Sequence, residues 1–240
     1  MSAPGPGYAC SMGVTRRAGV AAVVAIAAAA GVSSIVRLAR RSGVADADLE
    51  KALPGDELVL DPIFIADRAA VIDAPPEQIW PWLVQLGKGR AGWYMPMRLE
   101  RLLPGSWRGA RTIDPRWQTL AAGDRTPDYG PGAGEFETVV LDPPRTLVQY
   151  SVREPSAGWT WPEIDDPVPD GAMALTWVHI LEPLSPDRTR LHVRLRATTP
   201  GRTNMRGPVG IVGGLVDWLT IALLFRGLQE RVRQVGSHER

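Results

Sequence analysis

Five β-rich runs followed by one long apolar segment are the feature that most constrains how this chain can fold. The runs span residues 64–72, 135–141, 146–152, 172–181 and 190–198, and the apolar segment spans 209–234. Asp142-Pro143-Pro144-Arg145 and the Pro186-Asp187 turn each predict a hairpin between neighbouring runs. This order predicts an α+β fold in which a curved antiparallel sheet wraps around a long C-terminal helix.

The last run alternates apolar and polar side chains, which is typical of a strand with one buried face. Its polar positions are Arg190, His192, Arg194 and Arg196, and we expect them to face water. Residues 76–86 carry apolar side chains at helical spacing and end at Gly87, so they predict a helix, with a second short helix at 97–103.

The 209–234 segment is apolar on almost every face up to Phe225, except at Asp217. A membrane span is one interpretation of it. Because an acid and two glycines interrupt only about 15 apolar residues, a helix that covers the sheet is the better fit.

Residues 18–36 carry no charge and would form a helix about 28 Å long, just enough to cross the hydrocarbon core of a bilayer. A membrane anchor and a cleaved signal peptide, faintly of the twin-arginine type, both fit, and a buried Ala-rich helix is a third possibility. Arg37, Arg40 and Arg41 follow directly and favour the anchor. We expect a single-pass membrane protein. Its N-terminus is residues 1–17, the membrane span is 18–36, a juxtamembrane linker is 37–62, and the folded domain is 63–235.

Charge is distributed unevenly along the chain. Residues 1–41 hold five Arg and no acid, which leaves a net charge of about −4 on the remainder. A domain of that sign disfavours nucleic acid as a partner. The slight excess of arginines after the span favours a cytoplasmic domain. Cys10 is the single cysteine, so an intrachain disulfide is excluded.

One stretch of the sequence carries a family resemblance. Residues 72–83 read Ile-Asp-Ala-Pro-Pro-Glu-Gln-Ile-Trp-Pro-Trp-Leu, and Gln-Leu-Gly at 85–87 and Arg-Ala-Gly-Trp-Tyr at 90–94 follow. This opening resembles the polyketide cyclase/dehydrase-like members of the START-like superfamily, and the similarity extends over roughly 45–235. The resemblance implies a helix-grip fold that binds an apolar ligand between the sheet and the C-terminal helix. Residues 95–98 depart from the usual pattern of that group.

Aromatic and polar side chains give the candidate ligand-binding residues, because large rings with one N–H or O–H are suited to a mostly apolar pocket. Asp217 is included because a carboxylate in an apolar helix needs a partner. The six candidates are Trp82, Trp93, Tyr94, Trp177, His179 and Asp217.

No metal ligand set and no cofactor are predicted. The three histidines lack ligand spacing, and the acidic cluster Glu163, Asp165 and Asp166 reads as solvated. The Gly-x-Gly-x-x-Gly pattern at 87–92 follows a helix rather than a strand, so it does not indicate a dinucleotide site.

The sequence favours membrane-tethered binding of a lipid, isoprenoid or polyketide-like molecule over catalysis, because it offers no acid–base pair. An enzyme of cyclase, aromatase or dehydratase type and a protein-interaction or stress module are the alternatives. The expected partners are an apolar small molecule and the bilayer, and the oligomeric state is left open.

Overall fold

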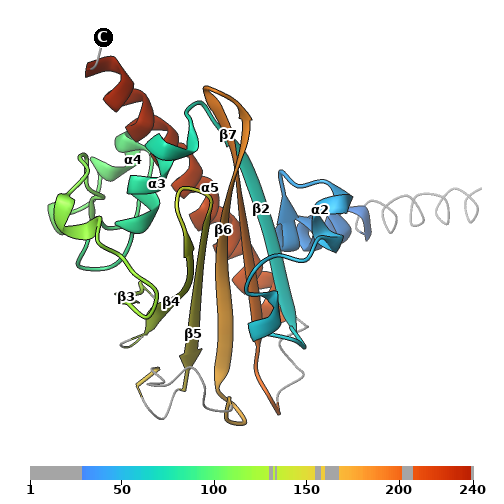
Figure 1. Cartoon of the computed structure of the whole chain (residues 1–240). Helices are drawn as coiled ribbons and strands as arrows, with labels where there is room; N and C mark the ends of the chain where they lie inside the picture. The colour runs from blue at the N-terminus through green and yellow to red at the C-terminus, as the bar shows by residue number, and fades with distance from the viewer. Residues whose placement is uncertain are drawn as a thin grey trace, which may run out of the picture.

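A single mostly antiparallel sheet organises the part of the chain that the computed structural model describes, namely residues 29–129, 132, 134–154, 158–159, 168–201 and 208–238. The seven strands lie in the order β1-β2-β7-β6-β5-β4-β3, and only the short β1–β2 pair is parallel (Figure 1). The strands are β1 (Arg41–Ser42), β2 (Phe64–Ile72), β3 (Arg125–Pro127), β4 (Glu135–Asp142), β5 (Thr146–Arg153), β6 (Met173–Ser185) and β7 (Arg188–Thr198).

The helices surround this sheet. A helix over residues 29–40 precedes β1, and the rest are α2 (Asp46–Glu50), α3 (Pro76–Val84), α4 (Met97–Glu100) and α5 (Pro208–His238), with 3-10 turns η1 (Asp56–Leu58), η2 (Gly105–Trp107) and η3 (Pro115–Trp117). The hairpin predicted at 142–145 is confirmed, because β4 pairs with β5 and the Arg145 N–H donates to the Asp142 carbonyl at 2.7 Å.

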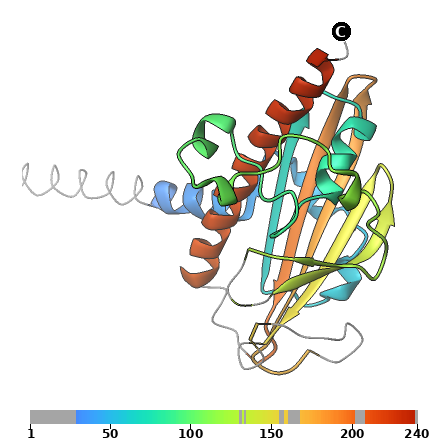
Figure 2. The ribbon, with the colours of Figure 1, turned by 90° about the vertical axis from the view of Figure 1, so that its left-hand side faces the viewer.

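The long helix α5 lies across the concave face of the sheet (Figures 1 and 2). Its residues Ile221, Leu224 and Leu228 are buried in one cluster with α3 and with the inward-facing residues of β2, β5, β6 and β7. Burial of such side chains stabilises the fold by about 1.5–3 kcal/mol each. The α+β prediction and the wrapped C-terminal helix are therefore confirmed.

The convex face of the sheet is not open to water, which corrects the prediction for the polar side of 190–198. Residues 44–60, here called the covering segment, lie over this face and bury Leu53 and Val59 against the outer side chains of β5 and β6. His192 is only 1% exposed and Arg194 only 2%. The alternation of β7 distinguishes the two faces of the sheet correctly. The polar face is buried because acidic side chains of the covering segment pair with its arginines.

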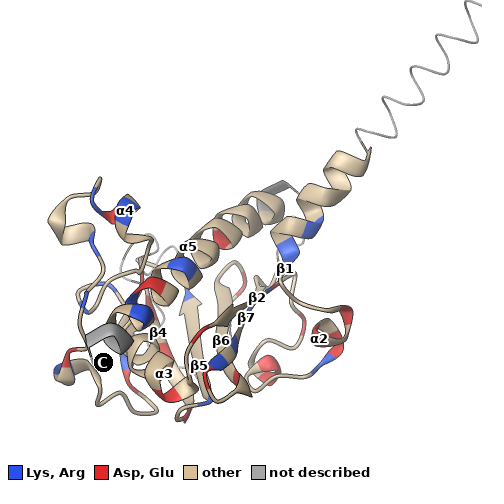
Figure 3. Ribbon diagram, turned by 90° about the horizontal axis from the view of Figure 1, so that it is seen from above, with Lys and Arg blue, Asp and Glu red and all other residues tan. Residues whose placement is uncertain are grey.

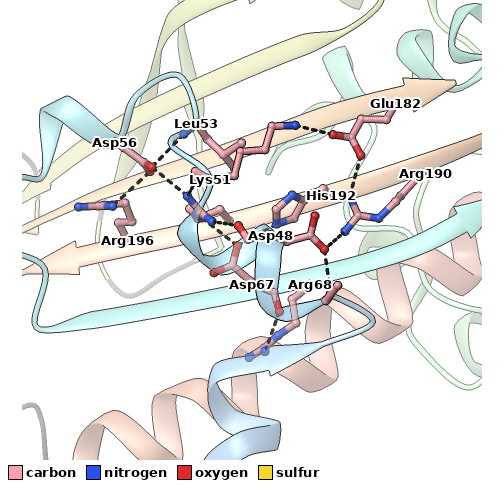
Figure 4. Close-up of polar contacts among 12 residues, drawn as sticks. Asp48, Lys51, Leu53, Asp56, Asp67, Arg68, Glu182, Arg190, His192 and Arg196 are labelled. Atoms are coloured by element: carbon pink, nitrogen blue, oxygen red, sulfur yellow. Dashed lines mark hydrogen bonds and ion pairs between the residues drawn. The ribbon is translucent and has the colours of Figure 1, made fainter.

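Ion pairs hold the covering segment in place (Figure 4). Asp48 accepts from Arg190 at 2.7 Å, and Asp56 accepts from Arg194 at 2.9 Å. Beneath them the buried carboxylate of Asp67 on β2 contacts both His192 and Arg194 at 2.8 Å. We expected residues 37–62 to be a linker, but residues 44–60 of this range pack on the sheet as a layer of the folded domain.

The two halves of α5 have different surroundings. The C-terminal half is packed on the sheet, whereas Val212, Val216 and Leu219 in the N-terminal half are at least half exposed. Residues Gly210–Gln234 form a helix long and apolar enough to cross a membrane by length and composition. The C-terminal half packs against the sheet as a core helix does, and the N-terminal half is the part that stays exposed.

The helix over 29–40 leaves the domain beside this N-terminal half of α5 (Figures 2 and 3). The two helices touch at Gly214, where an added Cβ would lie 2.4 Å from the Ala39 carbonyl oxygen, so only glycine fits. Arg68 of β2 joins them, because it donates to the Ala39 carbonyl at 2.7 Å and pairs with Asp217 at 3.0 Å.

Candidate functional site

A group of aromatic rings lies on the concave face, between the sheet and the segment that follows α3, and Trp93 of that segment donates to a carbonyl of α5. The rings of Trp93 and Trp177 are stacked, with centroids 5.6 Å apart and planes 14° apart. Phe136 of β4 lies 5.7 Å from Trp177 on one side, and His179 lies 4.3 Å from it on the other. Three of the six predicted ligand-binding residues, Trp93, Trp177 and His179, are thereby brought into one group.

A small cavity of about 20 Å³ lies beside the stacked tryptophans. Phe136 and Tyr129 complete its aromatic lining, and Gln149 of β5 adds an amide. A space of this size holds about one water molecule, so the site is closed in this conformation. A larger ligand can enter only if one of these rings moves.

Trp93 is the ring best placed to move, because it stands on an irregular segment between α3 and α4. This segment is closed by backbone pairing between Gly87 and Gly92. At Gly87 φ is +136° and a Cβ would come within 2.5 Å of Thr126, so glycine is required there. The indole N–H of Trp93 donates to the Thr220 carbonyl of α5 at a long 3.3 Å, and Tyr129 packs edge-on against its ring.

His179 is buried without a hydrogen-bond partner for either ring nitrogen among the described residues, and it is 1% exposed. Burial lowers the pKa of His179 from 6.5 to about 3. The backbone of the neighbouring Leu147 opposes part of that shift, although it lies outside good hydrogen-bond geometry. A buried neutral imidazole whose two nitrogens make no hydrogen bond lowers the stability of the fold, whereas an apolar side chain at the same position would not.

Replacing His179 with leucine is expected to stabilise the protein, and more so in acid. The unfolded chain binds more protons between about pH 6.5 and 3, so the wild type loses stability as the pH falls through that window. The loss attributable to His179 is about 2 kcal/mol at about pH 5. Denaturant unfolding of both proteins, in the same detergent, should show a gap that widens from neutral pH to pH 5. A gap that does not change with pH would contradict the partnerless, neutral state of this imidazole.

The other three predicted residues lie away from the cavity. The Tyr94 hydroxyl donates to the Trp82 carbonyl at 3.0 Å and accepts from Gln85 at 2.9 Å, and burial raises the pKa of Tyr94. The Trp82 ring packs edge-on against Tyr94 inside the core. Asp217 pairs with Arg68, so its partner is a side chain of the sheet. Trp82 and Tyr94 pack in the core beside α3, and Asp217 bonds α5 to β2.

Sequence reasoning missed the other residues that line the cavity, among them Phe136, Gln149 and Tyr129. Gln149 had a usable signal, because it is the polar position in the otherwise apolar run 147–150 and is the Cα partner of Trp177. Glu163, Asp165 and Asp166 lie outside the described residues. Within the described ranges, no group of three or more His, Cys, Asp or Glu could hold a metal ion.

Comparison with known proteins gives likeness at the level of structure alone, because no family model and no curated protein matches the chain. Solved structures with a similar course include protein MLL2253 from Mesorhizobium loti, at 20% identity over 71% of this chain and 97% of that one, with a TM-score of 0.39. An HSP90 activator from Plasmodium falciparum is 14% identical over 72% and 96%, with a TM-score of 0.38. A norcoclaurine synthase mutant from Thalictrum is 12% identical over 72% and 95%, with a TM-score of 0.40.

Scores of this size carry nothing about what the protein does. The fold is established by the chain's own geometry. A strand, two helices, a run of antiparallel strands and a long C-terminal helix on the concave face are the elements that the sequence resemblance implied, in the same order. The fold is therefore a helix-grip arrangement, in which one curved and mostly antiparallel sheet wraps around a long C-terminal helix.

Proposed function

We propose that the protein binds an apolar small molecule of lipid, isoprenoid or polyketide type between α5 and the concave face of the sheet, beside a membrane. The observation that carries this proposal is the stacked pair Trp93 and Trp177 at the wall of a closed cavity. In the bound state Trp93 moves away from Trp177, and the ligand lies between the two rings.

The chemistry of the site suits such a ligand. Trp177, Phe136 and Tyr129 offer broad apolar faces, which contribute most of the affinity in small-molecule pockets. Gln149 offers one amide to orient a hydroxyl or carbonyl group of the ligand. His179, whose ring nitrogens have no partner among the described residues, contacts the Trp177 ring edge-on and is a further polar group next to the site.

Binding without catalysis fits the electrostatics of the site better than proton transfer does. A histidine whose pKa is about 3 is a weak base near neutral pH. Asp128, the carboxylate at the cavity, is paired with Arg153 at 2.7 Å. The residues that line the cavity therefore supply packing and orientation.

The membrane part of the proposal rests on the uncharged segment 18–36 and the arginines after it. The helix over 29–40 carries Val32 and Ile35 exposed, as a helix that enters a bilayer would. Apolar ligands dissolve in the bilayer, so a domain held beside it meets them at high local concentration.

Trp93→Ala is expected to weaken binding of an apolar probe by about tenfold, because it removes a ring that closes over the ligand. The probe is farnesol carrying a photoreactive diazirine, added to the full chain in nonionic detergent micelles. After irradiation, cross-linked peptides are quantified by mass spectrometry. In the wild type we expect labels in peptides that contain residues 86–94 and 173–179, and excess unmodified farnesol should suppress them.

Trp107→Ala is the matched control, since Trp107 is a tryptophan of η2 that is 69% exposed and does not line the cavity. It should label as the wild type does. Labels confined to residues 18–36, or equal labelling of both variants, would sink the proposal of a ligand site beneath α5.

A further inference from the structure

A second and larger hollow lies on the opposite side of β2 from the aromatic group. It is an open groove of about 750 Å³ between the helix over 29–40 and the edge of the convex face. Its volume falls in the range of small-molecule pockets, about 300–1,000 Å³. The helix over 29–40 meets the domain beside β1 (Figure 3), and its residues line the groove on one side.

One face of the N-terminal helix forms the first wall. Its lining residues recur at i, i+4 and i+8, which places them in one stripe along the helix: Val32, Ser33, Val36, Arg37 and Arg40. The apolar members lie at the end away from the domain, and the arginines lie at the end next to it. The opposite wall is apolar, formed by Leu49, Pro62, Ile63 and Ile65.

The arginines of the groove are not all neutralised. Arg41 is paired with Asp46, but Arg37 and Arg40 are exposed and form no ion pair with any residue that the structure describes. The nearest lining carboxylate is Asp67, and it is already bonded to His192 and Arg194 at 2.8 Å. Two guanidinium groups therefore remain for an anion, and guanidinium matches phosphate geometry well.

The polarity of the groove matches a lipid lying in the adjacent leaflet. If 18–36 spans the bilayer, Val32 and Val36 lie at the level of the acyl chains and Arg37 and Arg40 at the level of the head groups. A phospholipid in that leaflet has its phosphate towards the domain and its tails towards the membrane, in the same order as the groove.

We propose that this groove binds one anionic phospholipid of the bilayer, with its phosphate on Arg37 and Arg40 and one acyl chain along Val32, Val36 and Ile65. The bound lipid fills the space between helix and sheet and so fixes the angle at which the domain sits on the membrane. This inference rests on the membrane tether of the proposed function and is independent of the aromatic cavity.

The test uses the full chain in nonionic detergent with added phosphatidylglycerol or phosphatidylcholine, and native mass spectrometry to count retained lipids. The wild type is expected to retain one phosphatidylglycerol in preference to phosphatidylcholine. Arg37→Gln with Arg40→Gln should reduce that preference by about tenfold to thirtyfold. Glycerol 3-phosphate, the soluble head group without chains, should not displace the lipid, since the apolar wall contributes to binding.

Arg98→Gln with Arg101→Gln is the matched control, because it removes the same charge from two exposed arginines around α4, on the far side of the domain (Figure 3). It should retain the wild-type preference. Equal loss in both double variants, or no preference in the wild type, would overturn the groove as a site. Flotation of the wild type with phosphatidylcholine vesicles separates the tether from the groove. A chain that floats but shows no preference retains its tether and lacks the site, whereas a chain that does not float refutes the tether and, with it, the groove.

Discussion

Replacing Arg231 with methionine is expected to lower the free energy of unfolding by about 3–5 kcal/mol. Arg231 of α5 and Glu100 of α4 form an ion pair at 2.6 Å in which both side chains are 0% exposed. Arg231 also donates to the Ala110 carbonyl at 2.7 Å and lies over the Tyr94 ring. Its loss leaves a buried carboxylate whose remaining ionic partner, Arg111, is partly exposed.

Arg233→Met is the control for this substitution, since it is the same change two residues further along the same helix. Arg233 pairs with Asp73 at 2.7 Å, but both side chains are about half exposed or more. Such a pair contributes about 0–1 kcal/mol. Urea unfolding of the three proteins in the same detergent gives the comparison, and similar midpoints for the two variants would show that the buried pair does not hold α4 to α5.

The double variant Glu100→Met with Arg231→Met should recover much of the stability that Arg231→Met loses. Removing both charges together removes the uncompensated carboxylate, and apolar replacements of buried pairs are often neutral or stabilising. The recovery separates the cost of an unpaired charge from the loss of packing. A double variant that is less stable than either single one would contradict this reading.

The main elements of the fold were predictable because each has a strong local signal. Apolar, β-rich runs located β2 and β4 to β6, and period-two alternation marked the two faces of β7. Proline and glycine marked the turns, and the apolar run after residue 208 indicated α5. The covering segment was not predictable in this way. Its anchors, Leu53 and Val59, are isolated apolar residues among turn formers, and its acids find their arginine partners only after β7 has paired in the sheet.

The candidate site was predictable only in part, for a similar reason. Trp93, Trp177 and His179 converge because strand parity and the family resemblance both point them at the concave face. Trp82, Tyr94 and Asp217 have similar residue chemistry but lie away from the cavity. Tyr94 contacts Trp82, Gln85 and Arg231, and Asp217 pairs with Arg68, and composition cannot reveal these contacts. The groove depends on how the helix over 29–40 crosses α5, which rests on the close approach at Gly214.

Replacing Arg194 with methionine is the second change expected to cost about 3–5 kcal/mol. From β7 its guanidinium reaches the carboxylates of Asp67 and Asp56 at 2.8 and 2.9 Å. It also donates to the Asp48 carbonyl at 2.7 Å and to the Lys51 carbonyl at 2.8 Å. Without it, the Asp67 carboxylate keeps His192 as its remaining side-chain partner among the described residues, and two carbonyls of the covering segment lose this donor.

The loss should be local as well as global, because these bonds hold residues 48–56 to the convex face. Hydrogen exchange of backbone amides should rise in peptides from the covering segment while peptides from α3 and α5 stay protected, since they belong to the core on the other face. Arg188→Met, at an exposed arginine of the same strand 3.8 Å from Asp73, is the control and should change neither stability nor exchange measurably. If Arg194→Met instead left 48–56 protected, the apolar contacts of Leu53 and Val59 alone would hold the covering segment, and the buried cluster around Asp67 would contribute nothing to its attachment.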